Sequence, residues 1–405
     1  MANKVKSIYW RVISSSSVKN LGIYIIAAML ARIATGASTI AVVLLAQANG
    51  LQGQTAGLLA ACITAPHVFG PVYGRWLDNS NDPRRLLAIT SCLFTVAFQI
   101  GLIGFYTEGL WLTISALLIC GLCSSFMMGG LSTQLTFQVD NDTNIQRRAQ
   151  SYDTLTYGFG LTVGPLIIAL FAKHYAIEIT AGWVMALPML AGLFVLFLPK
   201  RECQKNELLR NSIGFKQVLA TILHSQPLRR TLAMTSGASF SAAALPIIAV
   251  FLSDMWMQGK ENGAYLVTCY GLGCICGALW LMIKPLKANA IVLLRNVGTV
   301  LLVTLIFVVL SPNFTTGLVA YWLCGVVNSI FFAVTLAARR EYAPEQSAAQ
   351  IYMWIAAAKI SAASIGALVA GALVDHSIAI TMAVSYCVLI TTLLVCFWQR
   401  NERNH

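Results

Sequence analysis

The chain has 405 residues, of which 58% are hydrophobic and only 10% are charged, and its formal net charge is +12. A soluble domain carries about 25% charged residues, and a surface this apolar is not tolerated by water. The composition therefore excludes an ordinary soluble protein and indicates a protein that lies in a lipid bilayer.

Long apolar segments recur along the whole chain. A helix needs about 20 apolar residues to cross the hydrocarbon core of a membrane. Segments of this length predict an all-α membrane protein with twelve transmembrane helices, at residues 21–47, 54–76, 86–106, 109–137, 152–172, 179–198, 231–253, 263–283, 291–311, 314–337, 350–373 and 378–398.

One long polar interval, residues 199–230, divides the chain into two six-helix bundles at 1–198 and 231–405. Apolar residues inside this linker follow the spacing i, i+3, i+4, i+7, i+8, from Phe215 to Leu223, which predicts a short amphipathic helix on the membrane surface. The stretches AQSY at 149–152 and AQIY at 349–352 open the fifth helix of each bundle. Two related halves suit alternating access around a central site.

Basic residues gather on one side of the predicted helices. That side holds the group from Lys200 to Arg230 and most other lysines and arginines, whereas the other side receives only Lys173 and Lys260. The positive-inside rule then predicts an inner-membrane protein with both termini in the cytoplasm. Contact with the anionic lipid surface accounts for the net charge, so nucleic acid is not an expected partner.

Motifs for metals, cofactors and enzymatic chemistry are not expected in this chain. Cys120 and Cys123 form a CxxC, and Cys274 and Cys276 form a CxC, but both lie among small residues inside apolar segments, which indicates helix packing. The sequence has no GxxxxGK[ST] phosphate loop and no convergent nucleophile and base. We therefore predict a protein that is not an enzyme and needs no cofactor.

The stretch GRWLDNSNDPRRLL, residues 74–87, places two acids and three arginines between the second and third helices. Gly74, Asp78 and the basic pair Arg84 and Arg85 resemble the loop signature of the major facilitator superfamily. The family usually has a glycine where Asn81 stands here, and asparagine is the residue that best replaces it in a left-handed turn.

A second stretch, Gly160-Leu-Thr-Val-Gly164-Pro165 in the fifth helix, resembles part of the GxxxGP motif that is common among exporters of this family. The resemblance implies the family's twelve-helix fold. It also implies that Asp78 lies beside the start of the eleventh helix, where exposed N–H groups and the helix dipole favour an anion.

These residues are expected to form a gate between the bundles, in which Arg84 and Arg85 pair with acids on neighbouring loops. The alternative is that the charged loop only anchors the topology.

Polar residues inside the apolar segments are the candidates for substrate binding. A charge within a membrane is costly and indicates function, which singles out Arg32 and Lys359; His67 follows the helix-loosening Pro66. The resemblance implies that the first, fourth, seventh and tenth helices line the cavity. Uncharged polar candidates on them are Thr35, Thr39, Ser125, Ser132, Ser236 and Asn328.

Each of the three ionisable candidates has a structural alternative. Arg32 could bond backbone carbonyls, Lys359 could extend to the membrane interface, and His67 could be a packed, hydrogen-bonded histidine. No acid in the first helix is spaced to pair with Arg32, so we expect its positive charge to face the cavity and attract an anionic group of the substrate.

The coupling ion is harder to derive, because the acids Asp153, Asp254 and Asp375 are predicted near helix ends. His67 and Asp153 are the candidates for ion coupling. The sequence favours a monomeric secondary active transporter that exports a small organic molecule along an ion gradient by alternating access. The alternatives are an importer of an anionic metabolite or metal chelate such as a siderophore and, outside this class, a non-transporting receptor.

Overall fold

The computed structural model describes residues 15–78, 80–107, 109–135, 143–200, 215–284, 288–344 and 348–398. Within these ranges the chain is helical, and ten helical segments are long and apolar enough to cross a membrane. A shorter apolar helix at Leu155–Phe171 and the broken helix at 53–78 add to them. The prediction of an all-α membrane protein is confirmed, and the count is compatible with twelve spans.

The first bundle contains the helical segments α2 (Ser15–Ala48), α3 (Gly53–Thr64), η1 (Ala65–Phe69), α4 (Gly70–Asp78), α5 (Pro83–Tyr106), α6 (Leu110–Ser125), η2 (Phe126–Gly130), α7 (Leu131–Leu135), α8 (Thr143–Phe171), α9 (Ile177–Val184) and α10 (Leu187–Leu196). The rest of the chain contains α11 (Phe215–His224), α12 (Gln226–Ala243), α13 (Leu245–Met255), η4 (Lys260–Asn262), α14 (Gly263–Ile283), α15 (Ala290–Leu310), α16 (Phe314–Tyr342), α17 (Ala348–Val374) and α18 (Ile378–Trp398).

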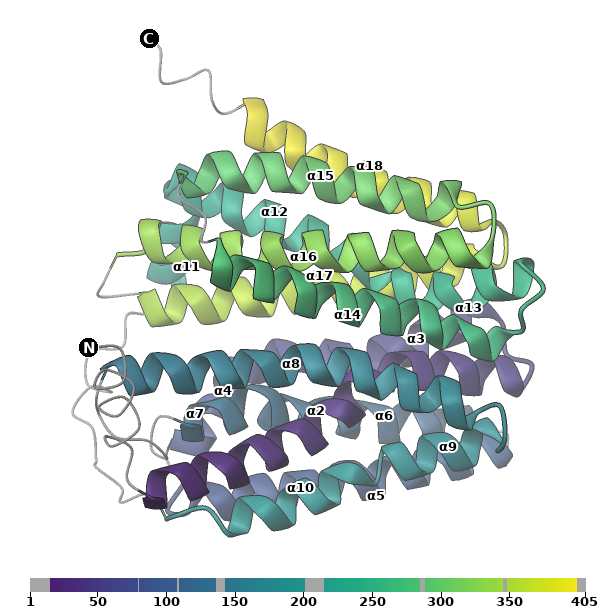
Figure 1. The fold of residues 1–405 in the computed structure, drawn as a ribbon, viewed down its shortest axis with the longest axis horizontal. Coiled ribbons are helices and arrows are strands. Elements are labelled where there is room, and N and C mark those ends of the chain that lie inside the picture. Colours follow the sequence, from purple (N-terminus) through teal and green to yellow (C-terminus); the bar gives the residue numbers. More distant parts are fainter. Residues whose placement is uncertain are drawn as a thin grey trace, which may run out of the picture.

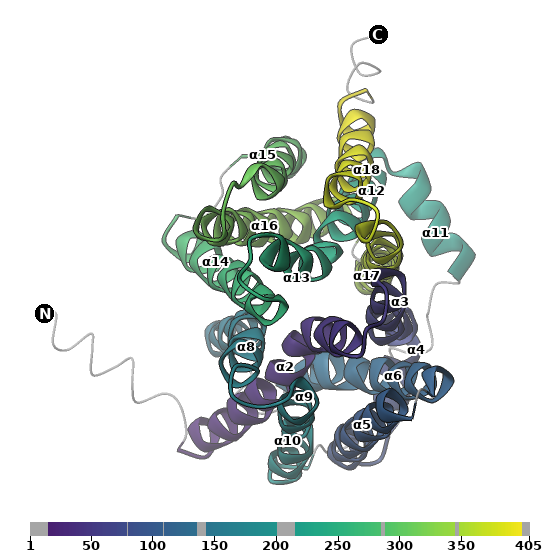
Figure 2. The ribbon, with the colours of Figure 1, turned by 90° about the vertical axis from the view of Figure 1, so that its right-hand side faces the viewer.

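The helices run side by side and form two groups (Figure 1). Seen from one end, the helices from α2 to α10 lie on one side and those from α12 to α18 on the other (Figure 2). Helix α3 packs on α17 and α8 packs on α14, so these two pairs join the bundles. Helix α11 lies where the amphipathic helix was predicted, and its Ile222 is buried against Leu228 and Ile351.

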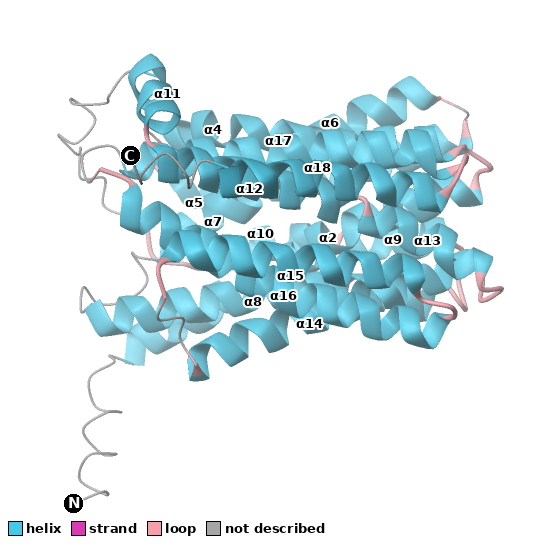
Figure 3. Ribbon diagram, turned by 90° about the horizontal axis from the view of Figure 1, so that it is seen from above, coloured by secondary structure: helices cyan, strands magenta, loops and turns pink. Residues whose placement is uncertain are grey.

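Loops gather at the two ends of the helices (Figure 3). We call the end that carries Arg84, Arg85 and α11 the basic end, and the end that carries the α2–α3, α8–α9 and α17–α18 turns the opposite end. At the opposite end Gly50 turns the chain from α2 into α3 with φ +70°, a left-handed conformation in which glycine has no side chain to clash.

Several predicted spans differ from the helices that form. The second span is interrupted by the 3₁₀ segment η1, because Pro66 has no N–H to continue the α-helical ladder. The fourth contains a π-helical turn, η2, next to two glycines. Helix α8 begins at Thr143 rather than 152, and α16 ends at Tyr342 rather than 337, because the first turns of α8 and the last turn of α16 are polar and extend past the apolar segment.

Glycines allow the closest contacts between helices. A Cβ on Gly160 of α8 would lie 2.4 Å from the Arg32 carbonyl oxygen of α2, and one on Gly164 would lie 2.4 Å from the Ile33 carbonyl oxygen. Between the bundles, a Cβ on Gly57 of α3 would lie 2.6 Å from the Gly371 Cα of α17. Small residues at such interfaces let backbones approach, which is how helices associate in lipid.

We predict that Gly160→Ala and Gly22→Ala, two substitutions on packed helices, change stability in opposite directions. The new methyl group at 160 forces α2 and α8 apart, and overpacking of this kind costs about 1–3 kcal/mol. Nothing lies within 4 Å of the Cβ position at Gly22, so there the gain in helix propensity, about 0.8–1 kcal/mol, is retained. Unfolding midpoints of the purified proteins in detergent measure both changes, and equal midpoints would contradict the packing argument.

Candidate functional site

A cavity of about 130 Å³ lies between the two bundles. Helices α2 and α8 of the first bundle and α12, α13, α14 and α16 of the second supply its walls. Its apolar lining consists of Ile40, Leu161, Ala242, Leu245, Pro246 and Val267. Since both bundles contribute, a relative movement of the bundles changes the shape of this cavity.

Four residues that carry hydroxyl groups line the same cavity. Thr35 and Thr39 come from α2, Tyr270 from α14 and Tyr321 from α16. The Tyr321 hydroxyl donates a hydrogen bond to the Leu245 carbonyl, 2.9 Å away, beside Pro246 of α13. A small apolar cavity with a few convergent polar groups is the usual form of a site for a small organic molecule.

Arg32 lies in a polar cluster between α2, α7 and α8 and is only 1% exposed. Its Nη1 lies 2.7 Å from an Asp153 carboxylate oxygen, and its Nη2 donates to the Ser132 hydroxyl at 2.7 Å. The guanidinium carbon lies 3.5 Å from the centre of the Tyr157 ring. The cluster is therefore a buried ion pair with hydrogen-bond partners on both sides.

Asp153 is satisfied from several directions. Besides Arg32, its carboxylate accepts hydrogen bonds from the Tyr24 hydroxyl and from the Ser132 hydroxyl, the latter at 2.9 Å. Arg32 also donates to the Thr156 hydroxyl and to the Asp153 carbonyl, the latter at 2.8 Å. The Arg32 Nε is buried without a hydrogen-bond partner, but the other polar groups of the cluster are bonded across α2, α7 and α8, and such networks hold helices in one arrangement.

The expectation that Arg32 presents an uncompensated charge to the cavity is wrong. The sequence has no acid in the first helix that could pair with Arg32, and Asp153 was predicted to lie near the end of the fifth helix. Because α8 begins at Thr143, Asp153 lies about three turns inside that helix, level with Arg32. Ser132 bonds to the same pair, so it is not available in the cavity either.

The remaining candidates of the first bundle are packed rather than exposed to the cavity. His67 Nε2 lies 3.0 Å from the Ser124 hydroxyl of α6, so it is a hydrogen-bonded histidine between α6 and η1. Ser125 donates to the Gly121 carbonyl one turn earlier on its own helix, at 3.3 Å. Pro165 is buried within α8, next to Gly164 at the α2 contact.

In the second bundle, Asn328 and Lys359 lie around one thiol. The Cys274 thiol of α14 lies near Asn328 of α16 and near Tyr270, and Lys359 of α17 lies within electrostatic range of it. Ser236 is partly buried on α12. Thr35 and Thr39 are thus the predicted residues that line the cavity, while Asn328 and Lys359 connect to it through Tyr270.

Contacts at the opposite end join the two bundles. The Gly53 N–H at the start of α3 donates to the Asp375 carboxylate that follows α17, and the Lys260 ammonium donates to the Gln47 side chain at 3.0 Å. Deeper along the same α3–α17 interface, the Ser364 hydroxyl donates to the Thr64 hydroxyl at 2.9 Å. These contacts hold the two bundles together on the side of the opposite end.

The charged loop at the basic end stabilises the first bundle itself. Asp82 caps the start of α5, and its carboxylate lies 2.9 Å from Arg84 Nε and 3.5 Å from Arg85 Nε. Arg84 also donates to the Leu198 carbonyl at the end of α10, whereas the Arg85 side chain is 80% exposed. The expected pairing of both arginines with acids on neighbouring loops is therefore wrong, because the acid belongs to their own loop.

Two gate residues are not fully described. The backbones of Gly74 and Asp78 belong to α4, but the surroundings of the Asp78 side chain and the chain segment 345–347 lie outside the described residues. The proposed contact between Asp78 and the start of the eleventh helix therefore stays a prediction.

Asp82→Asn should separate the capping role of Asp82 from its charge. The hydrogen bond from Arg84 holds the pKa of the Asp82 carboxyl below its ordinary value of 3.8. A lowered pKa stabilises the folded state above the unfolded pKa, and this contribution is lost as the pH falls through the folded value. Asparagine also caps helices well, so we expect a loss of about 0.2–1 kcal/mol at pH 7.

The difference between parent and Asp82→Asn should shrink as the pH falls through the lowered pKa of the Asp82 carboxyl, and it should disappear where both side chains are uncharged. Thermal unfolding of the two proteins across this pH range is the measurement. A difference that is the same at pH 7 and at acid pH would show that the ion pair contributes nothing.

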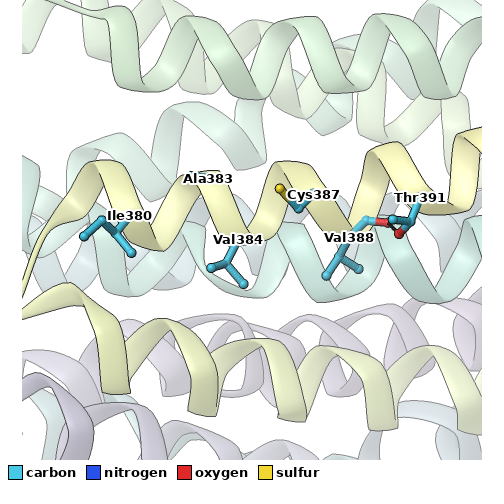
Figure 4. Close-up of a pocket in the computed structure, with 6 residues that line it drawn as sticks. All are labelled: Ile380, Ala383, Val384, Cys387, Val388 and Thr391. Atoms are coloured by element: carbon cyan, nitrogen blue, oxygen red, sulfur yellow. Dashed lines mark hydrogen bonds between the residues drawn. The ribbon is translucent and has the colours of Figure 1, made fainter.

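A larger hollow, of about 350 Å³, lies along the outside of α18. It is lined by one helix alone, by Ile380, Ala383, Val384, Cys387, Val388 and Thr391 (Figure 4). A furrow along one apolar helix face is where lipid chains lie in a membrane protein. It has no polar groups converging from several helices, so we do not assign a substrate to it.

Two helical bundles in a membrane, with a small polar-and-apolar cavity between them, define the class of secondary transporters. The sequence profile of the Major Facilitator Superfamily matches residues 24–294, about two thirds of the chain. The chain belongs to this family. A comparison with curated protein sequences gave no match.

Solved transporters share the fold. A POT family transporter in complex with a thioalcohol-conjugated peptide is 13% identical, with a TM-score of 0.72 over 96% of this chain and 97% of that one. The nucleoside transporter NupG is 12% identical, with a TM-score of 0.70 over 93% and 97%. A bacterial homologue of the human lysosomal transporter Spinster, in an inward-facing and unoccupied conformation, is 11% identical, with a TM-score of 0.65 over 95% of each chain.

Some residues of the site were not among the sequence-based candidates. Tyr24 and Thr156 of the ion-pair cluster and Tyr270 of the cavity wall carry ordinary hydroxyls in apolar helices, and nothing in their spacing distinguishes them. Tyr321 of the cavity wall is likewise an ordinary polar residue in an apolar helix. Arg339 was counted with the basic loops, although it is 4% exposed within α16.

Proposed function

We propose that this chain exports a small organic molecule across the inner membrane by alternating access, driven by an ion gradient. The observation that supports it best is the cavity between the bundles, where Thr35 and Thr39 meet Tyr270 and Tyr321. The exporter direction is favoured by the resemblance around Gly164 and Pro165, which pack α8 against α2.

The substrate would bind in this cavity through the threonine and tyrosine hydroxyls, with its apolar part against Leu161, Leu245 and Val267. Proton coupling would use Asp153, which is 13% exposed and holds the Arg32 charge. A proton that neutralises Asp153 would leave Arg32 buried without its counter-charge. Protonation would therefore favour a different arrangement of α2 and α8.

The contacts at the opposite end support a state that opens toward the basic end. By the positive-inside rule the basic end would face the cytoplasm, with both termini on that side. The protein would then take up its substrate from the cytoplasm, as an exporter must. One chain supplies both bundles, so a monomer would suffice.

A ligand screen followed by transport tests this proposal. Thermal unfolding of the purified protein with metabolites, antibiotics and siderophores identifies ligands, because a bound ligand stabilises the folded state. The best ligands are then loaded into proteoliposomes with and without an imposed proton gradient. We expect the ligand to cross the membrane at a rate that depends on the proton gradient. If ligands bind but show neither transport nor counterflow, the protein is a receptor and not a transporter.

The importer of an anionic compound stays a second candidate, because Arg339 and Lys359 place two positive charges in the second bundle. Opposite orientations of the gradient in the same proteoliposomes separate export from import.

A further inference from the structure

Arg339 of α16 and Lys359 of α17 form a pair of positive charges in the second bundle. Each charge lies within electrostatic range of the other. Arg339 is 4% exposed, and its Nε and Nη2 are buried without a hydrogen-bond partner. In the described part of the chain, no ion pair includes either residue. Two like charges in a membrane protein without an acid are costly unless something anionic compensates them.

Aromatic residues hold both cations in a crossed arrangement. Phe332 and Arg339 are seven residues apart on α16, and Tyr352 and Lys359 are seven residues apart on α17, so each pair shares one helix face. The Lys359 ammonium lies 4.2 Å from the centre of the Phe332 ring, and Arg339 interacts electrostatically with Tyr352. Each helix therefore presents its cation to the aromatic residue of the other.

Helix direction brings the two cations toward each other. Helix α16 runs toward the basic end and α17 runs away from it, and helical side chains lean toward the start of their own helix. Arg339 therefore leans into the bundle, and Lys359 leans back toward the basic end. Lys359 is partly exposed and Phe332 is 39% exposed, so Lys359 is the more accessible of the two cations.

The cations are also connected to the cavity. Lys359 lies within electrostatic range of Cys274, Asn328 and Tyr270 lie near the same thiol, and Tyr270 lines the cavity between the bundles. A molecule that extends from the cavity along α14 and α16 would meet Asn328 first and then the two charges.

We propose that Arg339 and Lys359 bind the anionic group, a carboxylate or a phosphate, of the transported molecule. This inference rests on the proposed transport function. Arg32, by contrast, is neutralised by Asp153 and takes no part in it. The face of the Phe332 ring beside Lys359 favours a molecule with an apolar or aromatic part next to its charge.

Binding of small anions to the full chain in neutral detergent tests the assignment. The probes are benzoate, phenyl phosphate, benzylamine as a cation of similar shape, and a short-chain phosphatidylglycerol, because a lipid headgroup offers the same anionic chemistry. Each is titrated while the thermal unfolding midpoint is followed, for the parent and for Lys359→Gln, Arg339→Gln and Lys359→Arg. The matched control is Arg295→Gln, which removes a cation that lies 5.0 Å from the Phe397 ring, between α15 and α18.

We expect benzoate or phenyl phosphate to stabilise the parent and benzylamine not to. Each glutamine variant should bind the anion at least about tenfold more weakly, as expected for a lost hydrogen bond to a charged group. Lys359→Arg and Arg295→Gln should bind like the parent.

Three results would overturn the proposal: equal anion binding in both glutamine variants, no stabilisation by any anionic probe, or stabilisation by phosphatidylglycerol alone. The last result would identify a lipid site instead of a substrate site.

The binding assay uses no membrane gradient, so its failure is distinguishable from failure of the transport function. If anion binding depends on both cations but no ligand is transported, the proposed transport function is wrong and the anion site is still supported. If the parent transports a ligand but both glutamine variants bind the anion as the parent does, the anion site is wrong and the transport function is still supported.

Discussion

Asp153→Asn should lower the free energy of unfolding by about 3–5 kcal/mol, because it leaves the Arg32 guanidinium buried without its counter-charge. Arg32 is 1% exposed, and the Asp153 carboxylate lies 2.7 Å from it. Ser132 and Tyr24, which now bond to this carboxylate, would face an amide instead. Asp254→Asn is the matched control, since Asp254 is exposed near the end of α13 and should change stability by less than about 0.5 kcal/mol.

The double variant Arg32→Gln with Asp153→Asn distinguishes a lost ion pair from lost packing. Removing both charges leaves no uncompensated ion, so the double variant should be more stable than Asp153→Asn alone. Denaturant unfolding in detergent gives the coupling energy between the two sites. Transport should stay impaired in the double variant if Asp153 carries the coupled proton. Additive losses of stability would contradict the ion-pair explanation.

Joining the two bundles at Thr64 and Ser364 should stop transport. Their hydroxyl oxygens lie 2.9 Å apart between α3 and α17, so the two side chains point toward each other, as the two cysteines of a disulfide must. We expect the Thr64→Cys, Ser364→Cys variant to lose transport by about tenfold or more after oxidation and to regain it after reduction, because alternating access separates the bundles there. Transport into proteoliposomes, measured before and after a membrane-permeable oxidant, gives the result.

The controls are the two single cysteine variants, treated with the same oxidant, since the chain already contains eleven cysteines. They should keep their activity. If the double variant forms the disulfide and transports at the parent's rate, α3 and α17 do not separate during the cycle.

The sequence was sufficient for the architecture, because the number and length of apolar segments determine the helices of a membrane protein. The amphipathic pattern from Phe215 to Leu223 likewise predicted α11. The ends of the helices were harder to predict, because hydropathy indicates where a helix leaves the lipid and not where the helix itself ends. The first turns of α8 and the last turn of α16 are polar, so they extend beyond the predicted spans.

The candidate site could be predicted only in part. Thr35 and Thr39 line the cavity because a threonine pair one turn apart on an otherwise apolar helix marks its polar face. The partner of Arg32 could not be found in the same way, because Asp153 is 121 residues away in the sequence. The spacing of residues within one helix cannot reveal an ion pair that forms between two helices. For the same reason it could not show that Arg339 and Lys359 lie within electrostatic range of each other.

The distance along the chain between Arg32 and Asp153 also matters while the protein is being made. Ribosomes add about 5–20 residues per second, so the first helix emerges roughly 6–24 s before the aspartate, 121 residues later, exists. During that interval the arginine has no counter-charge, and the helix that carries it is costly to release into lipid. The ion pair can therefore form only after α8 is made, and a chain that stops after the fourth helix should carry the cost of an unpaired Arg32 in the membrane.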